Sequence, residues 1–525
     1  MEAAPMFPDP DSFYHAKIAL FLKNGVILHA FPWFRFTTWP AEYVDAHFLY
    51  HVLLIPFVAA FDPMVGMKVA ALVFGLIACA AVYGFLKWLR APWPTALTLA
   101  AMLSPAFLNR IAFPRAISLS VALFTAITWA VLAKRPRVAL ILSALFVWLY
   151  HGWPTALLVL LAAGVAEIVA WRMTKSRQTM GAEGQVPYRA EREAGARPDR
   201  VSTVGWPAAW GSIFRVGIAV MAGLALGIVT NPYFPELLSF SVVDIFKIGV
   251  VNQGYKISVG SEWRPATWFD LAATCGPAFF ALLLSIGAFL HHAIAQRRVP
   301  SREEIFRVMA CLFLAAGFTA LTLKSGRYVE YAVPCLVFAA GALLSASRET
   351  VENEWVPAVR QWLGLRRARR VLAAIAVSVV LVSLVAAQIE FVWNRKNYRA
   401  EQYAFATEWI SANVPADETV FTNTWDVSSI LFYLDDTHRY LVGLDPTFMY
   451  DPNPELYARW LDIVSGRNAD ETHIPYYFQS RTVLIDGRDP RADTFAAALQ
   501  ASGLFHEVAK QDTVRLYSCL PDCQF

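Results

Sequence analysis

Carboxylate and imidazole side chains that could bind a metal or phosphate, or accept a proton, gather near the N-terminus. Asp11 and His15 are followed in the same segment by Asp45, His47 and His51. If residues 43–54 are helical, His47 and His51 share one face at i, i+4 spacing, a separation that suits a metal ion or a phosphate. The same residues would also suit a helix anchored at a membrane surface by interfacial histidines and tyrosines. The sequence leaves both interpretations open.

A second group of charges lies in the run Ser258-Val-Gly-Ser-Glu-Trp-Arg-Pro, where Glu262 and Arg264 stand two residues apart. Such a pair next to an apolar run is typical of an interfacial ion pair. It is also compatible with a pair of catalytic groups.

A third group is cationic. Arg327 lies in a short turn before an apolar run, and Arg110 and Arg115 lie in another turn. Arginine forks bind phosphate oxygens in pairs, so these side chains at one membrane face would suit a phosphate at headgroup depth. Contacts with ordinary lipid phosphates are the simpler alternative.

The elements that must position these residues are membrane spans. Apolar residues make up 57% of the 525 residues and charged residues only 16%, which is typical of a membrane protein. The net charge of +4 is too small to indicate nucleic-acid binding. Ten apolar runs predict about ten transmembrane helices, at 65–88, 94–110, 116–133, 137–151, 154–173, 208–230, 268–294, 305–323, 328–347 and 371–391.

Blocks of lysine and arginine set the orientation of these spans. Alternate connections are basic, at 87–90, 134–137, 172–200, 297–302 and 360–370. By the positive-inside rule they are cytoplasmic, so both termini and the three groups of charges face outside. This assignment requires that 47–61 not cross the membrane, and we interpret it as a helix at the outer surface or dipping into it. The polar stretch 174–205 is expected to be a flexible loop without a function.

After residue 392 the pattern becomes that of a soluble domain. Helical stretches near 400–412, 427–435, 453–465 and 491–502 alternate with strand-like runs at 419–422, 440–443, 482–486 and 514–518. This predicts a small α/β domain, so the chain divides into a first loop (1–64), a transmembrane domain (65–391) and an extracytoplasmic domain (392–525). Cys519 and Cys523 would form a disulfide in an oxidising compartment or stay reduced elsewhere.

The order of these motifs resembles the GT-C superfamily of membrane glycosyltransferases, and within it relatives of the catalytic subunit of oligosaccharyltransferase. Asp11-Ser-Phe-Tyr-His is similar to that family's first-loop Asp-x-Tyr-Tyr-His motif, whose aspartate is catalytic. Ser258-Val-Gly-Ser-Glu is similar to the outer-loop Ser-Val-Ser-Glu motif, whose glutamate contacts the acceptor or orients the site. Asn423-Thr-Trp-Asp partly matches the Trp-Trp-Asp-Tyr-Gly motif that holds a peptide acceptor.

The resemblance implies a GT-C-like fold and a division of roles. Asp11 and Glu262 are the expected catalytic residues, and Trp425 and Asp426 the expected acceptor-binding residues, although this last run equally suits turns and helix caps. The remaining pocket residues are His15, Asp45, His47 and His51.

Two departures from the family pattern bear on these expectations. GT-C proteins have a span before the first-loop aspartate, and no apolar run of that length precedes Asp11 in this sequence. Either translation begins upstream of Met1, which we favour, or the sequence is truncated. Oligosaccharyltransferases also carry a metal-binding acidic pair in the second outer loop, whereas no Asp or Glu occurs between Pro63 and Ala166. Arginines in its place suggest direct stabilisation of a singly phosphorylated leaving group.

We therefore predict an enzyme without a metal cofactor, with Mn²⁺ or Mg²⁺ as the alternative. It transfers a hexosyl or pentosyl group from a polyprenyl-phosphate donor to a glycan, lipid or protein acceptor, with inversion. The donor phosphate would be bound by Arg110, Arg115, Arg264 and Arg327. The resemblance places it in a bacterial inner membrane, among membrane lipids, with its site on the periplasmic side.

Two other functions are compatible with parts of the sequence. A peptide oligosaccharyltransferase with a diphosphate donor is favoured by Trp425 and Asp426 and opposed by the missing acidic pair. A lipid or polysaccharide transporter, or a non-catalytic assembly factor, would show charged mid-membrane helices and related halves. The charges here gather at one face instead, which favours an enzyme.

Overall fold

The computed structural model describes residues 6–183, 206–251, 257, 260–296, 300–364, 398–467, 470–520 and 523, with isolated helical positions between 367 and 385. Several predictions lie wholly or largely outside this range. They concern the span at 371–391, most of the loop at 174–205, Ser258, and the basic residues Arg297 and Arg298.

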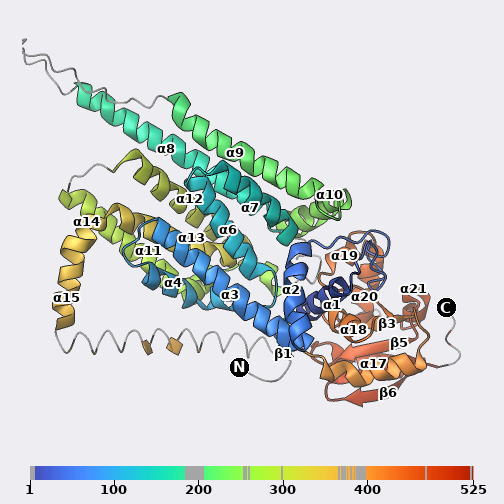
Figure 1. The fold of residues 1–525 in the computed structure, drawn as a ribbon. Helices are drawn as coiled ribbons and strands as arrows, with labels where there is room; N and C mark the ends of the chain where they lie inside the picture. The colour runs from blue at the N-terminus through green and yellow to red at the C-terminus, as the bar shows by residue number, and fades with distance from the viewer. Residues whose placement is uncertain are drawn as a thin grey trace, which may run out of the picture.

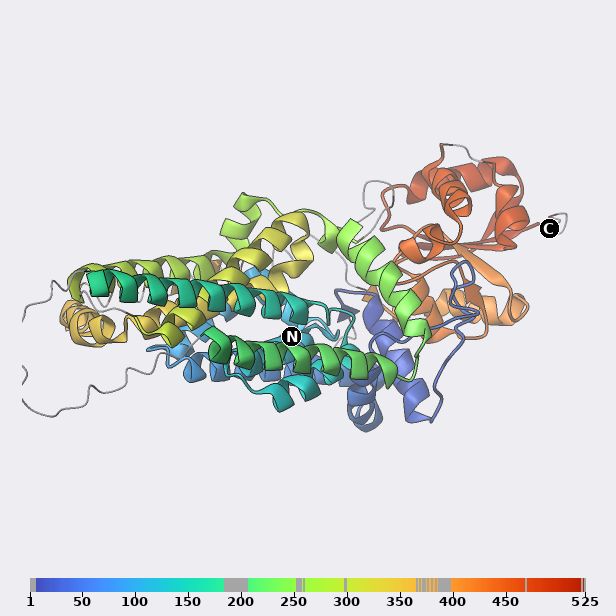
Figure 2. The same ribbon diagram turned by 90° about the horizontal axis from the view of Figure 1, so that it is seen from above.

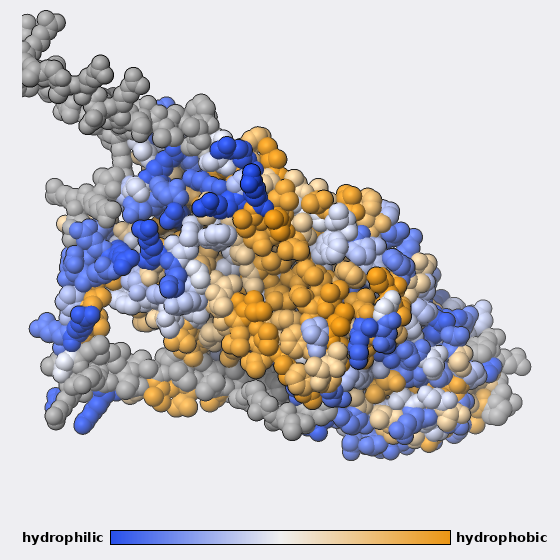
Figure 3. Space-filling view, viewed as in Figure 1, coloured by the Kyte–Doolittle hydropathy of each residue, from blue (hydrophilic) through white to orange (hydrophobic). Residues whose placement is uncertain are grey.

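Long apolar helices form a bundle that identifies an integral membrane protein. In the described residues, six helices are long and apolar enough to cross a membrane. They are α3 (Pro63–Trp88), α8 (Thr155–Glu183), α9 (Trp206–Val229), α11 (Trp268–Gln296), α12 (Arg302–Lys324), and α13 (Val329–Ala346) with the preceding turn η3 (Gly326–Tyr328). Figure 3 shows apolar surface across the middle of the bundle, with hydrophilic surface at both ends.

The remaining predicted spans differ in length or shape. Those at 116–133 and 137–151 are the shorter helices α6 (Ile117–Leu132) and α7 (Pro136–Leu149). The one at 94–110 is broken into α4 (Pro94–Met102) and α5 (Pro105–Ala112), bent by 78°. Pro105 explains the break, because proline disfavours a helical conformation in the residue before it, and Ser104 is extended.

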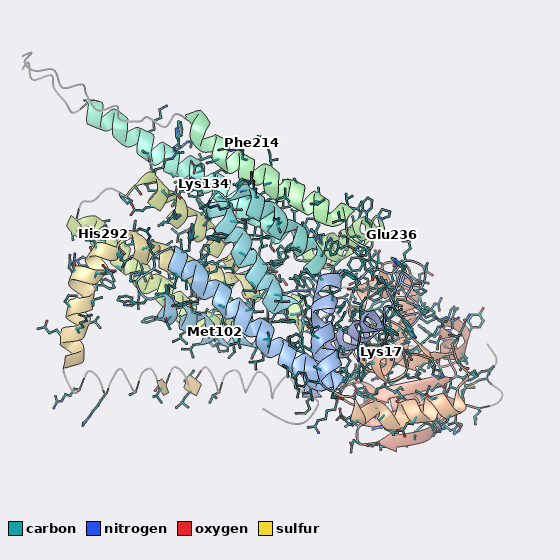
Figure 4. All side chains as sticks on the ribbon, in the orientation of Figure 1. Lys17, Met102, Lys134, Phe214, Glu236 and His292 are labelled. Atoms are coloured by element: carbon teal, nitrogen blue, oxygen red, sulfur yellow. A yellow bond between two sulfur atoms is a disulfide. The ribbon has the colours of Figure 1, made fainter. Side chains whose placement is uncertain are left out.

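The two ends of the bundle differ in the parts of the chain that lie there. The α/β domain and the first loop lie together at one end, which we call the domain end (Figures 1 and 2). Figure 4 shows Lys17 and Glu236 at the domain end, and Lys134 and His292 away from it. Lys134, in a predicted cytoplasmic block, pairs with Glu303 at 3.1 Å. The position of Lys134 away from the domain end agrees with the topology that the charge blocks predict.

The first loop contains two helices, α1 (Asp11–Lys23) and α2 (Phe48–Ala60), which pack on each other. Each has 13 residues, about 20 Å of helix, whereas the hydrocarbon core is about 30 Å thick. The helix in the stretch 47–61 is therefore shorter than a typical span, which is compatible with a helix at the outer surface or dipping into it.

Further short elements complete the part of the chain between the long helices. Before α11 lie α10 (Glu236–Ser241), the π-helix η1 (Val242–Val251) and η2 (Ser261–Trp263). After α13 follow α14 (Arg348–Thr350), η4 (Val351–Trp355) and α15 (Val356–Gly364).

The C-terminal domain is a five-stranded mixed sheet with helices, in strand order β4-β3-β5-β7-β6. β3 runs parallel to β4 and β5, and β7 runs antiparallel to β5 and β6. The strands are β3 (Thr419–Thr422), β4 (Arg439–Tyr440), β5 (Thr482–Asp486), β6 (Phe505–Gln511) and β7 (Val514–Cys519). The helices are α17 (Glu401–Asn413), α18 (Ser428–Leu434), α19 (Thr447–Tyr450), α20 (Pro454–Ser465), α21 (His473–Phe478) and α22 (Ala492–Ser502). A disulfide joins Cys519 to Cys523.

The first loop is joined to this domain by backbone pairing at two places. β1 (Met6–Phe7) pairs antiparallel with β2 (Tyr398–Arg399), immediately before the first-loop aspartates. The segment 33–36 runs beside β4, where the amide of Tyr440 donates to the carbonyl of Trp33 at 2.7 Å and the amide of Arg35 donates to the carbonyl of Tyr440 at 2.9 Å. The segments predicted as separate, 1–64 and 392–525, thus share a sheet edge.

Gly443 provides a test of this packing. A Cβ on Gly443 would overlap the ring of buried Phe34, so Gly443→Ala should push the first loop off the domain and destabilise the protein by about 1–3 kcal/mol. The measurement is the unfolding midpoint in detergent. Gly84→Ala in α3, where a Cβ would meet nothing within 4 Å, is the matched control and should not lower the midpoint. Equal midpoints for the two variants would contradict the packing.

Candidate active site

Asp11 and Arg115 form the centre of a buried cluster of charges at the domain end. Asp11 begins α1, directly after the β1–β2 pairing, and Arg115 lies between α5 and α6. Arg115 donates from Nη2 to Asp11 Oδ2 at 2.5 Å and forms a two-pronged pair with Asp9. The other oxygen of Asp11, Oδ1, is buried and has no hydrogen-bond partner among the described residues. This oxygen is free to accept a proton from a ligand.

The surroundings of Asp11 favour its protonated form. Burial, the largest cause, raises the pKa of Asp11 well above its ordinary value, against the opposing charge of Arg115. The carboxylates of Asp9, Glu262 and Asp426 raise this pKa further. A carboxylate with a raised pKa is a stronger base than an ordinary carboxylate, which suits it to accept a proton.

Glu262 connects three arginines. It accepts a hydrogen bond from Arg110, and its Oε1 lies 3.6 Å from both Arg115 Nη1 and Arg327 Nη1. Burial alone would raise the pKa of Glu262, but Arg110, Arg327 and Arg115 together hold it well below its usual range. Glu262 therefore stays ionised and keeps the three guanidinium groups close together.

Arg110 is held by two carboxylates. It donates to Glu330 Oε2 from Nη2 at 2.7 Å and from Nε at 3.1 Å, in addition to its bond with Glu262. Glu330 lies in the first turn of α13 and is 2% exposed. The bend between α4 and α5 is what brings Arg110 to this position.

Arg327 has mainly neutral partners. Its Nη2 donates to Tyr150 Oη at 2.6 Å and contacts His151 Nε2 at 2.8 Å. Its guanidinium carbon lies 4.6 Å from the centre of the Trp263 ring. Among the described residues, no carboxylate is in direct hydrogen-bond contact with Arg327, unlike Arg110 and Arg115, which leaves its charge available to an anion.

A chain of hydrogen bonds runs from Asp45 to the helix that carries Asp11. His51 Nδ1 lies 2.7 Å from Asp45 Oδ2, and His51 Nε2 lies 2.7 Å from His15 Nδ1. A carboxylate only accepts, so His51 carries its proton on Nδ1 and accepts from His15 through Nε2. His15 and Asp11 are separated by one helical turn, so this buried chain fixes the face of α1 that presents Asp11.

His47 lies beside this chain. The helix begins at Phe48 rather than at residue 43, and His47 precedes it as its cap. The backbone carbonyl of His47 accepts from the amide of His51 at 3.0 Å, and the ring centre of His47 is 5.0 Å from that of His151. Burial, the largest cause, lowers the pKa of His15, His47 and His151 well below the ordinary value, and neighbouring cations add to the effect. These imidazoles are neutral hydrogen-bonding groups.

The α/β domain closes the site with Asp426. Its Oδ2 accepts from Tyr398 Oη at 2.7 Å, and its charge acts on Asp11. Trp425 is half-buried beside it. Tyr398 belongs to β2, so the pairing that positions the first-loop aspartates also positions Asp426.

Arg264 is the predicted site residue that the structure does not bring into the cluster. Its side chain is exposed, and its backbone carbonyl accepts from the amide of Gly326 at 2.8 Å. This contact holds the turn that carries Arg327. The prediction that Arg264 binds the phosphate therefore gains no support from a contact with the cluster.

A metal ion in a protein needs several ligand side chains arranged around one point. In the part of the chain that the structure describes, no group of three or more His, Cys, Asp or Glu side chains is placed to hold a metal ion. Between Asp9, Asp11 and Glu262, where a cation would meet three carboxylates, lies the guanidinium of Arg115.

Comparisons with known proteins identify the fold. No protein-family model and no curated protein matches the sequence. Among solved structures, the archaeal oligosaccharyltransferase AglB from Archaeoglobus fulgidus, in complex with an inhibitory peptide and a dolichol-phosphate, is 13% identical, with a TM-score of 0.58 over 99% of this chain and 71% of AglB. ArnT from Cupriavidus metallidurans in the apo state is 12% identical, with a TM-score of 0.53 over 98% of this chain and 93% of ArnT. This chain has the GT-C fold.

The likeness to these structures confirms the predicted fold, a helical membrane bundle combined with an α/β domain. The cluster also contains four residues for which the sequence predicts no role. These are Asp9, Tyr150, His151 and Glu330. The Tyr150-His151 pair, polar residues ending an apolar run at the outer face, was the available signal for two of them.

Proposed function

We propose that this GT-C protein transfers a sugar from a polyprenyl-phosphate donor to an acceptor hydroxyl, without a metal ion and with inversion at the anomeric carbon. The observation that carries the proposal is Asp11: one carboxylate oxygen is held by Arg115, and the other is buried without a hydrogen-bond partner among the described residues. Arg115 is in turn linked through Glu262 to Arg110 and Arg327. This combination supplies a proton acceptor next to an anion site.

In the proposed reaction, Asp11 Oδ1 takes the proton of the acceptor hydroxyl as that oxygen attacks the anomeric carbon. The bond between this carbon and the phosphate oxygen breaks on the opposite face, which inverts the centre. The electron pair stays on the phosphate oxygen, and the developing charge is stabilised by the arginines.

The donor phosphate is best accommodated by Arg327. Arg110 and Arg115 already contact carboxylates directly, whereas Arg327 donates to the neutral groups Tyr150 and His151. A phosphate that replaces one of these neutral contacts gains a charge-assisted hydrogen bond. Arg110 and Arg115 then act mainly through their charge and by holding Glu262 and Asp11 in place.

We favour a single phosphate over a diphosphate as the leaving group. A diphosphate is normally neutralised by a divalent cation, and among the described residues the guanidinium of Arg115 lies between the carboxylates of Asp9, Asp11 and Glu262 that such a cation would bridge. Asp426 belongs to the α/β domain and its charge acts on Asp11. We therefore propose that the acceptor approaches Asp11 along this domain. We accordingly place donor binding in the first loop and bundle, and acceptor binding at the α/β domain, on the periplasmic side of a bacterial inner membrane.

Metal independence has a direct test. Arg115 lies between the carboxylates that a cation would bridge. An excess of EDTA over divalent metal should therefore leave the rate of sugar transfer unchanged to within about twofold. The measurement is the initial rate of transfer by purified protein in nanodiscs, with and without added Mn²⁺ or Mg²⁺. Loss of activity in EDTA that manganese restores would contradict the proposal and direct attention to Asp45, His47 and His51.

A further inference from the structure

His151 presents an N–H group to a carboxylate that it does not reach. Its Nε2 lies 2.8 Å from Arg327 Nη2. A guanidinium only donates, so Nε2 accepts, and the neutral ring carries its proton on Nδ1. Nδ1 faces Asp244 Oδ2 at 3.6 Å, too far for a hydrogen bond.

Asp244 is correspondingly unsatisfied. It lies on η1, 9% exposed, and its Oδ2 has no hydrogen-bond partner among the described residues. Burial raises the pKa of Asp244 to about 7, with Arg327 lowering it and Asp445 of the α/β domain raising it. A buried polar atom without a partner is costly, and this one lies 3.6 Å from Nδ1 of His151, for which no closer acceptor occurs among the described residues.

An N–H donor next to a carboxylate acceptor is the pair that a hydroxyl group satisfies, because a hydroxyl both accepts and donates. The position of the pair indicates which hydroxyl. Arg327, the proposed phosphate ligand, is bonded to His151, so the pair begins one side chain away from the phosphate. In the donor, the sugar is attached directly to that phosphate.

We propose that His151 Nδ1 and Asp244 Oδ2 together bind a hydroxyl of the donor sugar, which accepts from Nδ1–H and donates to Oδ2. This inference rests on the proposed function and adds a sugar subsite to it. The subsite lies between the outer loop that carries η1 and the residues that follow α7, and Arg327 connects it to the proposed phosphate site.

The test is equilibrium binding to the full-length protein in nanodiscs. The probes are undecaprenyl phosphate and undecaprenyl phosphate carrying glucose, mannose, galactose or arabinose. We expect the wild type to bind at least one sugar-bearing lipid more tightly than undecaprenyl phosphate. Asp244→Asn should weaken binding of that lipid by about tenfold or more, the effect of one hydrogen bond to a charged group, and change binding of undecaprenyl phosphate by less than about twofold.

Undecaprenyl phosphate also reports whether each variant is folded. Glu236→Gln, an exposed carboxylate on the neighbouring α10, is the matched control and should change neither affinity. The subsite is overturned if no sugar-bearing lipid gains affinity in the wild type, or if Asp244→Asn weakens both kinds of lipid equally or neither. If undecaprenyl phosphate itself does not bind, or binds equally to Arg327→Met, the proposed function fails as well.

Discussion

Replacing Asp11 by asparagine is expected to lower the rate of sugar transfer by about 10²- to 10⁴-fold, the usual contribution of a general base. The amide keeps the shape of the carboxylate but cannot accept the proton of the acceptor hydroxyl. The fold should persist, because Arg115 retains Asp9 and Glu262 as partners. Initial rates and unfolding midpoints of the two proteins measure both effects.

The matched control is Asp62→Asn, the same change at an exposed carboxylate of the first loop. Asp62 accepts from the amide of Met64 at 3.0 Å and caps α3, a role that asparagine fills equally well. Its activity should match the wild type. More than a tenth of the normal rate in Asp11→Asn would reject the role of Asp11.

The same carboxyl group sets the expected pH dependence. Burial holds the pKa of Asp11 above its ordinary value, and the proton acceptor must be deprotonated to act. Activity should therefore fall as the pH is lowered through this raised pKa, while the fold is retained. An activity that is flat with pH across the acidic range would point to another proton acceptor.

Arg110→Met should be the most destabilising of the single changes considered at the site. It leaves Glu330 buried without its guanidinium partner, and breaking a buried ion pair from one side costs about 3–5 kcal/mol. We expect a large fall in the unfolding midpoint. The double variant with Glu330→Gln removes the unpaired charge and should recover part of the loss.

Arg264→Met is the control for this experiment. Its side chain is exposed, so the change should lie within about 0.5 kcal/mol of the wild type. The comparison also tests the exposed position of Arg264. Equal effects of Arg110→Met and Arg264→Met would contradict the buried pair.

Local patterns in the sequence predict the elements well. The buried strands β3 and β5 have the predicted bounds, because each is a short β-branched and aromatic run between turns. The six long spans follow from hydropathy alone. The charge blocks place the first loop and the α/β domain at the same end of the bundle, as Figure 1 shows. They predict the side of the membrane on which each segment lies, but not which residues are in contact.

Contacts between distant segments are what the sequence does not reveal. The pairing of Arg115 with Asp9 and Asp11 joins segments more than 100 residues apart, and it depends on the bend at Pro105 and on the β1–β2 pairing. Hydropathy reports a continuous apolar run through 94–110 and is insensitive to this bend. Likewise, the two-residue spacing of Glu262 and Arg264 suggests a joint role, whereas Glu262 lies in the cluster and the side chain of Arg264 is exposed.

The central claim is that Asp11 promotes transfer from a singly phosphorylated lipid. The most direct measurement uses labelled polyprenyl-phosphate monosaccharide, membranes from cells that lack the gene as the source of acceptor, and purified protein in nanodiscs, with mass spectrometry of the released lipid. The account predicts label in the acceptor and release of polyprenyl monophosphate with the wild type, and neither with Asp11→Asn. Transfer that proceeds equally with Asp11→Asn, or only from a diphosphate-linked donor, would contradict it.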